Sequence, residues 1–228
     1  MDNQRRALRG VASELAKTVT EGMTVGLGSG STVAGLLEEL APILIERKVS
    51  INGVPTSAQI ETVAARNGIR LAPFRGSVEL ILDGADQVDA ELNLIKGGGG
   101  ALLKEKILMG SARRTAVVAS EDKFAKRLCE NGVRVPVEVA PMARESAKVS
   151  ISMLGGVPEE RLLPKGYPYF TENGNLIFDV SFEPIAEPRQ LEVKLRSIPG
   201  VAEVGIFTIR PITVYRLKAD GVFDRLEG

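Results

Sequence analysis

A run of four glycines, Gly97–Gly100, is the segment most suited to chemistry, because a lysine precedes it and a carboxylate follows it. Glycine lets the backbone approach a ligand closely and point successive N–H groups at it. Lys96 can bring a positive charge to the same place, and Glu105 lies near the start of a helix expected over about 101–109. The segment therefore predicts a loop that binds a negatively charged group beside a candidate base. The alternative is that Glu105 is one more charge on a solvated helix face.

A loop rich in hydroxyl groups follows the first expected strand, residues 23–28. Free N–H groups at a helix N-terminus, together with hydroxyls, suit an anion or a polyhydroxylated ligand. The loop is not a Walker A loop or a G-x-G-x-x-G fingerprint, since it lacks the Gly-Lys-Ser/Thr ending and the third glycine. An ordinary strand–helix turn with a serine cap is the alternative. The loop opens an expected helix over 31–47 and contains Ser29, Gly30, Ser31 and Thr32.

Two carboxylates follow the expected strand 78–84, in the sequence Asp83-Gly84-Ala85-Asp86. If the chain turns at Gly84, both can face the same crevice and accept hydrogen bonds from sugar hydroxyls. Capping of the next turn by one of them is the alternative. Asp89, a little further on, is expected to be solvated.

Lys123 follows the expected strand 114–120, in what reads as a helix start. A cation is unfavourable at a helix N-terminus, so an anion bound nearby would explain it. A chance surface lysine is the alternative.

The chain contains no histidine. Ser-His-Asp and Cys-His catalysis and histidine-ligated zinc are therefore excluded. A general base must be Asp, Glu, Lys, Tyr or the single cysteine, Cys129, which has no histidine to activate it.

The charge balance gives no global field, because 29 Lys and Arg residues equal 29 Asp and Glu residues. No partnership with nucleic acid or a membrane is expected, and any phosphate must be held by local geometry. A single cysteine cannot form an internal disulfide, and the N-terminal segment has no apolar stretch, so we expect no signal peptide and a cytoplasmic location.

Short apolar strands alternate with amphipathic helices over the first 130 residues. Besides the elements above, a strand at 49–55 precedes a helix that Thr56 and Gln59 open as a capping box and that ends near Gly68. This rhythm predicts an α/β fold with a mainly parallel, Rossmann-like sheet covered by helices on both faces.

From about Val133 the pattern becomes strand, helix, strand, strand, helix, strand, which matches a ferredoxin-like unit. Its hairpin is expected to join 167–171 to 176–182 through the turn Glu172–Asn175. A strand at 212–218 is expected to return to the first sheet. We therefore predict a catalytic domain of residues 1–131 plus 209–228 and a smaller inserted α+β domain, 132–208, that offers surfaces for self-association.

In combination and in this order, the motifs resemble the type A ribose-5-phosphate isomerase family. The resemblance rests on GLGSGST, DGAD, KGGGGALLKEKI, VPVEVAPMAR, TENGNLIFDV and IPGVAEVGIF and extends from about residue 5 to residue 222. It implies interconversion of D-ribose 5-phosphate and D-ribulose 5-phosphate without a cofactor or metal. From the self-association surfaces of the inserted domain we expect a homodimer or homotetramer. Ser29 stands where relatives often carry Thr, and Gly100 where Ala is common.

The matching positions imply that Glu105 is the catalytic base and that Asp83, Asp86 and Lys96 line the reacting end. Lys123 is implied to help hold the phosphate. The substrate contacts implied are Ser29, Gly30, Ser31, Thr32, Gly84, Ala85, Gly97, Gly98 and Gly99, in addition to those carboxylates and lysines.

Moving a carbonyl between two carbons needs a proton taken from one and returned to the other, which a carboxylate can do. A positioned base contributes about 3–5 kcal/mol, less than the roughly 8 kcal/mol at which typical enzymatic accelerations begin. Donors to the enediolate oxygen, Lys96 and the N–H groups of Gly97–Gly99, are expected to supply the rest. The main rival is a non-catalytic sugar-phosphate sensor, for which the chain lacks a recognisable DNA-binding segment. An acyl-CoA transferase or sugar-phosphate deaminase matches the motifs poorly.

Overall fold

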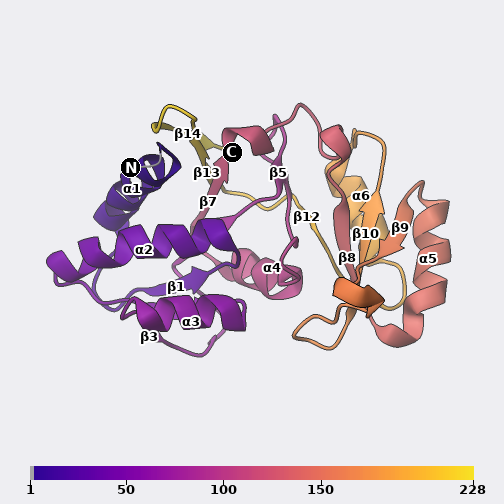
Figure 1. The fold of residues 1–228 in the computed structure, drawn as a ribbon, viewed down its shortest axis with the longest axis horizontal. Helices are drawn as coiled ribbons and strands as arrows, with labels where there is room; N and C mark the ends of the chain where they lie inside the picture. The colour runs from indigo at the N-terminus through magenta and orange to yellow at the C-terminus, as the bar shows by residue number, and fades with distance from the viewer. Residues whose placement is uncertain (1–2) are drawn as a thin grey trace. The chain divides into compact units, whose positions relative to one another are not determined.

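The structure is a computed structural model that describes residues 3–228 (Figure 1). Internal contacts divide the chain into two compact units. The first unit contains residues up to Gly84, Lys104–Lys123 and Ile209–Gly228. The second unit contains Ala85–Leu103 and Phe124–Thr208. The sequence-based expectation of an inserted domain at 132–208 stays a prediction.

The first unit is built on a seven-stranded sheet in the order β14-β13-β7-β4-β1-β2-β3. Every neighbouring pair is parallel except β13 with β14, so the predicted mainly parallel sheet is confirmed. The order reverses between β1 and β4, and in such sheets this switch point marks the ligand crevice. The strands are β1 Thr24–Leu27, β2 Asn52–Pro55, β3 Arg70–Leu71, β4 Leu80–Gly84, β7 Thr115–Ser120, β13 Thr213–Leu217 and β14 Phe223–Glu227.

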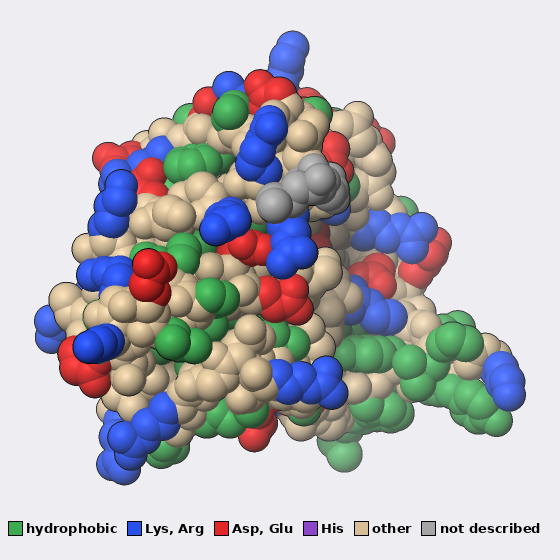
Figure 2. All heavy atoms as spheres, turned by 60° about the vertical axis from the view of Figure 1, so that its left-hand side comes forward, with side chains coloured by type: hydrophobic (Ala, Val, Ile, Leu, Met, Phe, Trp, Pro, Cys, Tyr) green, Lys and Arg blue, Asp and Glu red, His purple; other side chains and the backbone are tan. Residues whose placement is uncertain are grey.

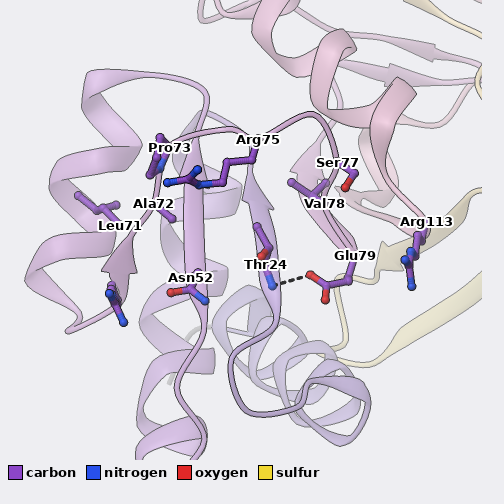
Figure 3. A pocket seen from close by; sticks show the side chains of 11 residues that line it. Thr24, Asn52, Leu71, Ala72, Pro73, Arg75, Ser77, Val78, Glu79 and Arg113 are labelled. Carbon is purple, nitrogen blue, oxygen red and sulfur yellow. Dashed lines mark hydrogen bonds between the residues drawn. The ribbon is translucent and has the colours of Figure 1, made fainter.

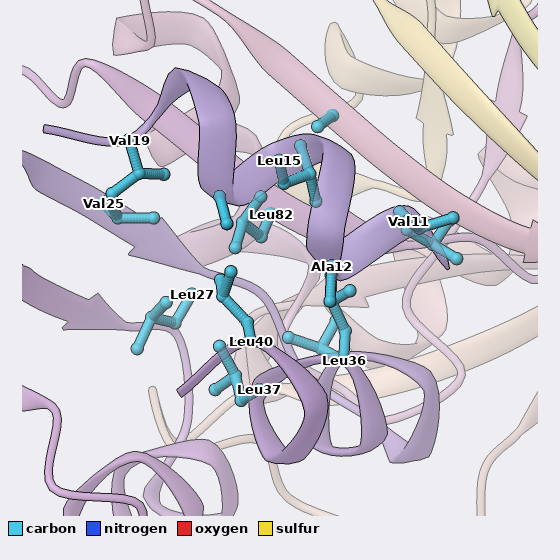
Figure 4. Close-up of a cluster of buried hydrophobic side chains, with 14 of the residues drawn as sticks. Val11, Ala12, Leu15, Val19, Val25, Leu27, Leu36, Leu37, Leu40 and Leu82 are labelled. Carbon is cyan, nitrogen blue, oxygen red and sulfur yellow. The ribbon is translucent and has the colours of Figure 1, made fainter. Parts of the chain in front are cut away.

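One face of this sheet packs against helices α1, Asn3–Thr18, and α2, Ser31–Glu46. Figure 4 shows leucines of both helices meeting the side chains of β1 and β4, with Leu36 and Leu40 among them. These side chains are at most 3% exposed, so the cluster buries the alternate residues of each strand that face the helices. Helix α3, Ala58–Arg66, contacts α2, β2 and β3.

The opposite face holds helix α4, Leu102–Ser111. A Cβ added at Gly26 of β1 would lie 3.2 Å from Leu108 of α4 and 3.1 Å from Ile81 of β4. The helix therefore packs closely on the strands because residue 26 has no side chain.

The second unit contains a four-stranded antiparallel sheet, ordered β11-β8-β10-β9, and a small sheet, β12-β6-β5. Helices α5, Arg144–Met153, and α6, Pro188–Arg196, complete the predicted strand–helix–strand–strand–helix–strand succession. The core includes Phe178 and Val137, both 0% exposed. The strands are β5 Gln87–Val88, β6 Leu94–Ile95, β8 Val135–Val139, β9 Val157–Glu160, β10 Leu176–Ser181, β11 Val201–Val204 and β12 Ile206–Phe207.

Several expected elements are wrong in detail. Residues 167–171 form only isolated bridges, and β9 takes the place of that strand. Ser57, not Thr56, caps α3 by accepting a hydrogen bond from the N–H of Ile60 at 3.3 Å. No α-helix follows Ser120, where a 3-10 turn, Glu121–Lys123, stands instead. Further 3-10 turns are Glu130–Gly132, Pro141–Ala143 and Pro164–Gly166.

Positive and negative side chains are mixed over the face of the molecule that Figure 2 shows, as the balanced composition leads one to expect. Within residues 3–228, none of the helices has both the length and the apolar character that crossing a bilayer requires.

Glu138 anchors the turn after residue 170 in the second unit. Its Oε1 accepts hydrogen bonds from the Thr171 hydroxyl at 2.8 Å and from the Asn173 and Asn175 side-chain amides at 3.0 and 2.9 Å. Because Glu138 is fully buried, Glu138→Ala leaves these donors without their acceptor. We expect a loss of about 3 kcal/mol in the free energy of unfolding, measured by urea denaturation.

A matched control for this prediction is Glu159→Ala, because Glu159 pairs with Arg134 at an exposed position. Exposed pairs contribute about 0–1 kcal/mol, so this variant should unfold close to the parent. Equal midpoints for the two variants would contradict the anchoring role of Glu138.

Candidate active site

The polar residues of the first unit gather at the carboxyl edge of its parallel sheet. The 29–32 loop follows β1, Asp83 and Gly84 end β4, and Lys123 follows β7. Because β4 and β7 are parallel neighbours, the helix between them must run back along the sheet and begin at this edge. Glu105 occupies the first turn of that helix, α4. The fold thus brings the predicted first-unit residues to one edge of the sheet.

Asp83 is fully buried, and its Oδ1 accepts a hydrogen bond from the N–H of Gly84 at 2.7 Å. A Cβ added at Gly28 would lie 2.0 Å from the same oxygen. Gly28 therefore provides the space in which the Asp83 carboxylate lies. This contact joins the loop after β1 to the end of β4, on the two sides of the switch point of the sheet.

The hydroxyl loop extends further than the sequence indicated. The Oγ of Ser29 lies 2.8 Å from Oγ1 of Thr56 and donates to Oγ of Ser57 at 2.7 Å. Thr56 is 1% exposed and donates to the carbonyl of Leu27 at 3.0 Å. Thr56 and Ser57 follow β2, the neighbour of β1, and this placement is the signal that could have identified them.

The N-terminus of α2 provides backbone donors beside these hydroxyls. Gly30 stands at the N-cap with φ 98°, a conformation that favours glycine, and it has no side chain to cap the helix. The N–H of Gly30 donates to Gln59 at 3.3 Å, so Gln59 contacts the loop instead of forming a capping box with Thr56. Ser31 is exposed. Thr32 lies next to Gly84, because a Cβ added at Gly84 would be 3.7 Å from the Cβ of Thr32.

Glu105 is 4% exposed, so the solvated-face alternative is wrong. Leu108, one helical turn later, packs on Gly26 and Ile81, and residues three apart share a face. The packing of Leu108 therefore turns Glu105 toward the sheet. Lys123, in the turn after β7, is half-buried.

In the second unit, Asp86 is bonded to the glycine run. Its Oδ2 accepts a hydrogen bond from the N–H of Gly98 at 2.8 Å. Gly97, with φ 103°, and Gly100, with φ 79°, hold the loop in conformations that favour glycine, and the N–H of Gly100 donates to the carbonyl of Gly97 at 2.9 Å. Ala85 is half-buried before Asp86.

Asp89 lies in the same unit and was expected to be solvated, which is wrong. Its side chain is 5% exposed and its Oδ1 accepts hydrogen bonds from the N–H groups of Glu91 and Asn93 at 2.9 and 2.8 Å. Asp89 therefore holds a tight turn.

Two side chains that the sequence did not reveal fix the carbonyl side of the glycine run. Arg161 donates to the carbonyls of Gly97 and Gly98 at 3.0 and 2.9 Å, and its other edge is bound by Asp179, with Nε donating at 2.8 Å. The hydroxyl of Tyr169 donates to the carbonyl of Gly99 at 3.1 Å. With the carbonyls held, the run keeps a defined shape.

Lys96 is 3% exposed, and its Nζ lies 5.7 Å from the centroid of the Phe207 ring. Its backbone N–H donates to the carbonyl of Gly205 at 2.9 Å. A buried lysine retains its charge only with compensating contacts, and the ring supplies one of them.

Cys129 is buried, and burial raises the pKa of its thiol to about 12. It therefore remains protonated at neutral pH and is a poor nucleophile. Among residues 3–228, His, Cys, Asp and Glu side chains form no group of three or more that could hold a metal ion.

Residues 52–221 match the family model described as ribose 5-phosphate isomerase A (phosphoriboisomerase A). A ribose-5-phosphate isomerase A from Methanosarcina acetivorans is 46% identical over 209 residues, which cover 90% of this chain and 87% of the relative. Ribose-5-phosphate isomerase A 1 from Oceanobacillus iheyensis is 38% identical, and the match covers 98% of this chain and 99% of the relative.

Solved structures show the same similarity in three dimensions. The ribose 5-phosphate isomerase A of Methanocaldococcus jannaschii superimposes with a TM-score of 0.89 at 37% identity, covering 97% of this chain and 98% of that one. A D-ribose-5-phosphate isomerase in complex with phospho-erythronic acid gives a TM-score of 0.91 at 36% identity, with all of both chains covered.

Proposed function

We propose a catalytic mechanism for this chain. The chain belongs to the ribose 5-phosphate isomerase A family and is therefore an enzyme that isomerises ribose 5-phosphate. The observation that carries the mechanism is the burial of Glu105 at the edge of the sheet where Asp83 and the hydroxyl loop also lie. A carboxylate in that position can act on a sugar whose hydroxyls the neighbouring groups bind.

Glu105 takes the proton from C2 of the open-chain aldose. The electron pair of the broken C–H bond forms the C1–C2 double bond, and the C1 carbonyl oxygen becomes the negative oxygen of an enediolate. Glu105 then returns the proton to C1. The proton of the C2 hydroxyl passes to the negative C1 oxygen, so that C1 carries a hydroxyl and C2 becomes the carbonyl of D-ribulose 5-phosphate. One carboxylate can make both transfers because the two carbons are adjacent.

Negative charge develops on oxygen in this sequence and needs donors. We assign that role to Lys96 and to the N–H groups of Gly97 and Gly99, because the N–H of Gly98 already donates to Asp86. Removing one well-aimed donor typically costs about 2.7–4 kcal/mol in the barrier. Together with the base, two such donors exceed the roughly 8 kcal/mol at which typical enzymatic accelerations begin.

The remaining polar groups bind and open the sugar. We assign ring opening to the carboxylate pair Asp83 and Asp86, one of which exchanges a proton with the ring oxygen or the C1 hydroxyl. Lys123 and the N-terminus of α2 suit the phosphate, because both are positive. The substrate contacts proposed are Ser29, Gly30, Ser31, Thr32, Gly84, Ala85, Gly97, Gly98 and Gly99.

The reaction can be tested by NMR of ribose 5-phosphate with the purified protein in D₂O. We expect signals of the ketose to appear together with deuterium at C2 of the aldose that is reformed. Ketose formation without any solvent deuterium would overturn the exchangeable carboxyl base, and unchanged substrate would overturn the assigned reaction.

The hydrogen bonds from Arg161 to the glycine run predict that replacing Arg161 lowers turnover. Arg161→Met removes two hydrogen bonds to the carbonyls of Gly97 and Gly98 and leaves Asp179 without its cation. A misplaced donor loop can cost about 10²-fold, and we expect a fall in kcat of about 10–100-fold, measured by steady-state kinetics. Arg134→Met is the matched control, because Arg134 forms its ion pair with Glu159 at an exposed position. Equal turnover in both variants would show that the loop keeps its shape without Arg161.

We propose that the chain forms a homodimer or homotetramer through its second unit. The segment 162–170 exposes Leu162, Leu163, Tyr167 and Phe170 at 53%, 47%, 66% and 53%. Exposed apolar clusters of this kind are typical of protein interfaces. Light scattering should report more than one copy per particle for the parent and a smaller particle for Leu163→Glu, whereas a monomeric parent would contradict the proposal.

We also propose a cytoplasmic location. The single cysteine is free and buried, which agrees with a reducing compartment. Oxidation-independent folding, with equal yield in reducing and oxidising buffers, is the expected behaviour.

A further inference from the structure

A second pocket lies in the first unit at the amino edge of the sheet, opposite the edge that carries Glu105. It holds about 490 Å³, within the range of small-molecule sites. Its walls come from the starts of β1, β2 and β3 and from the segments before β4 and β7. Strand β1 separates the two edges by four residues, roughly 13 Å at 3.3 Å per residue. The pocket is therefore a different site from the proposed active site.

The pocket is strongly cationic in a chain without net charge. Arg70 on β3, Arg75 in the loop before β4, and Arg113 after α4 all line it. The only carboxylate among the lining residues, Glu79, accepts a hydrogen bond from the backbone N–H of Thr24 at 2.6 Å. The lining thus carries three positive side chains and one negative one, and the negative one is bonded to the backbone.

These arginines differ from the arginines of the structure that form ion pairs. Arg5, Arg144 and Arg216 each pair with a carboxylate. Over residues 3–228, the guanidinium groups of Arg70, Arg75 and Arg113 take part in no ion pair or hydrogen bond. Three unpaired guanidinium groups around one pocket repel one another, so an anion between them would be stabilised.

The arrangement of the walls narrows the class of anion. Figure 3 shows Arg75 extending toward the side where Leu71, Ala72 and Pro73 lie, while Arg113 stands on the side of Glu79. Guanidinium groups on two sides suit a ligand with more than one phosphate group, since arginine binds phosphate through paired hydrogen bonds. The apolar surface of Leu71, Ala72 and Pro73 suits a ring attached to those phosphates.

We propose that this pocket binds a small organic polyphosphate, a ring joined to two or more phosphate groups, independently of the sugar phosphate at the active site. Arg75 and Arg113 bind the phosphates, and the Leu71–Pro73 segment packs against the ring. Asn52 adds a polar side chain to the lining, and its amide group donates to the carbonyl of Gly22 at 2.9 Å.

The test is calorimetric titration of the full chain with ADP. Pyrophosphate and adenosine are titrated separately, because they represent the phosphate groups and the ring-bearing portion of ADP. We expect ADP to bind more tightly than either part, and the double variant Arg75→Gln/Arg113→Gln to bind it at least about tenfold more weakly, since charge-assisted bonds to phosphate are lost. The matched control is Arg47→Gln, an exposed arginine outside the pocket. All three positions lie on the surface, and circular dichroism should show parent-like folding.

A competition experiment between ADP and ribose 5-phosphate tests whether this pocket is distinct from the active site. Saturating ribose 5-phosphate should leave the affinity for ADP unchanged, and the double variant should keep the KM and kcat of the parent. Displacement of ADP by ribose 5-phosphate, equal binding by the double variant, or no binding of ADP or pyrophosphate to the parent would each overturn the proposal.

Discussion

Replacing Glu105 with glutamine is expected to lower kcat by about 10²–10⁴-fold while KM stays near the value of the parent. The amide has nearly the shape of the carboxylate but cannot take a proton from C2. Glu105 is 4% exposed in the first turn of α4, so the substitution also removes a buried charge, and the fold should be retained. Steady-state kinetics measured in both directions should show the same loss, because one group makes both transfers.

Glu145→Gln is the matched control for that variant, because Glu145 also lies in the first turn of a helix, α5, but with its side chain 79% exposed. Its turnover should equal that of the parent. If Glu105→Gln turned over substrate at a rate close to that of Glu145→Gln, Glu105 would be removed from the mechanism. Loss of activity with loss of the folded circular dichroism spectrum would instead assign Glu105 a structural role.

The position of Glu105 depends on a feature that is visible in the sequence but explained only by the structure. Gly26 lies in the middle of a strand, where glycine is ordinarily unfavourable. Leu108 and Ile81 occupy the space that its side chain would fill, so α4 can pack closely on the sheet. The strand–helix alternation predicted the sheet and the helix, while the depth at which the helix packs depended on tertiary contacts.

The gathering of polar residues at the carboxyl edge of the sheet could be predicted from the sequence for a physical reason. Parallel strands buried on both faces read as continuous apolar runs, and the polar residues that follow them must meet at one edge. Thr56 and Ser57 follow the same rule after β2. Hydroxyls before a helix commonly cap it, however, and the sequence therefore favours capping of α3 as the role of Thr56. The hydroxyl network with Ser29 resolves the competition between these two uses.

The contacts of Arg161 and Tyr169 could not be predicted, because they join residues 64 and 70 positions apart in the sequence. No periodicity or spacing encodes which arginine will reach a given carbonyl. The sequence did not predict strand β9, because Pro158 is unfavourable in a strand. The proline is tolerated because β9 is an edge strand that pairs only with β10 in the described sheet.

Replacing Lys96 with methionine is expected to lower kcat by about 10²–10³-fold, the cost of losing one well-aimed donor to a developing negative oxygen. Methionine preserves most of the length and the apolar stem, so the packing of the 3%-exposed side chain is largely kept. The interaction strengthens as charge moves onto the oxygen, and kcat should therefore fall far more than KM rises.

Lys148 gives this prediction a close control. Its Nζ lies 5.6 Å from the ring of Phe178, much as that of Lys96 lies 5.7 Å from the ring of Phe207. Lys148→Met therefore removes a comparable cation–π contact from the same unit without touching the glycine run. If both variants lost a similar amount of stability but only Lys96→Met lost turnover, the ammonium group of Lys96 would act on the substrate. Similar turnover in the two variants would leave Lys96 a structural role and transfer the stabilisation of the enediolate to the backbone N–H groups of Gly97 and Gly99 alone.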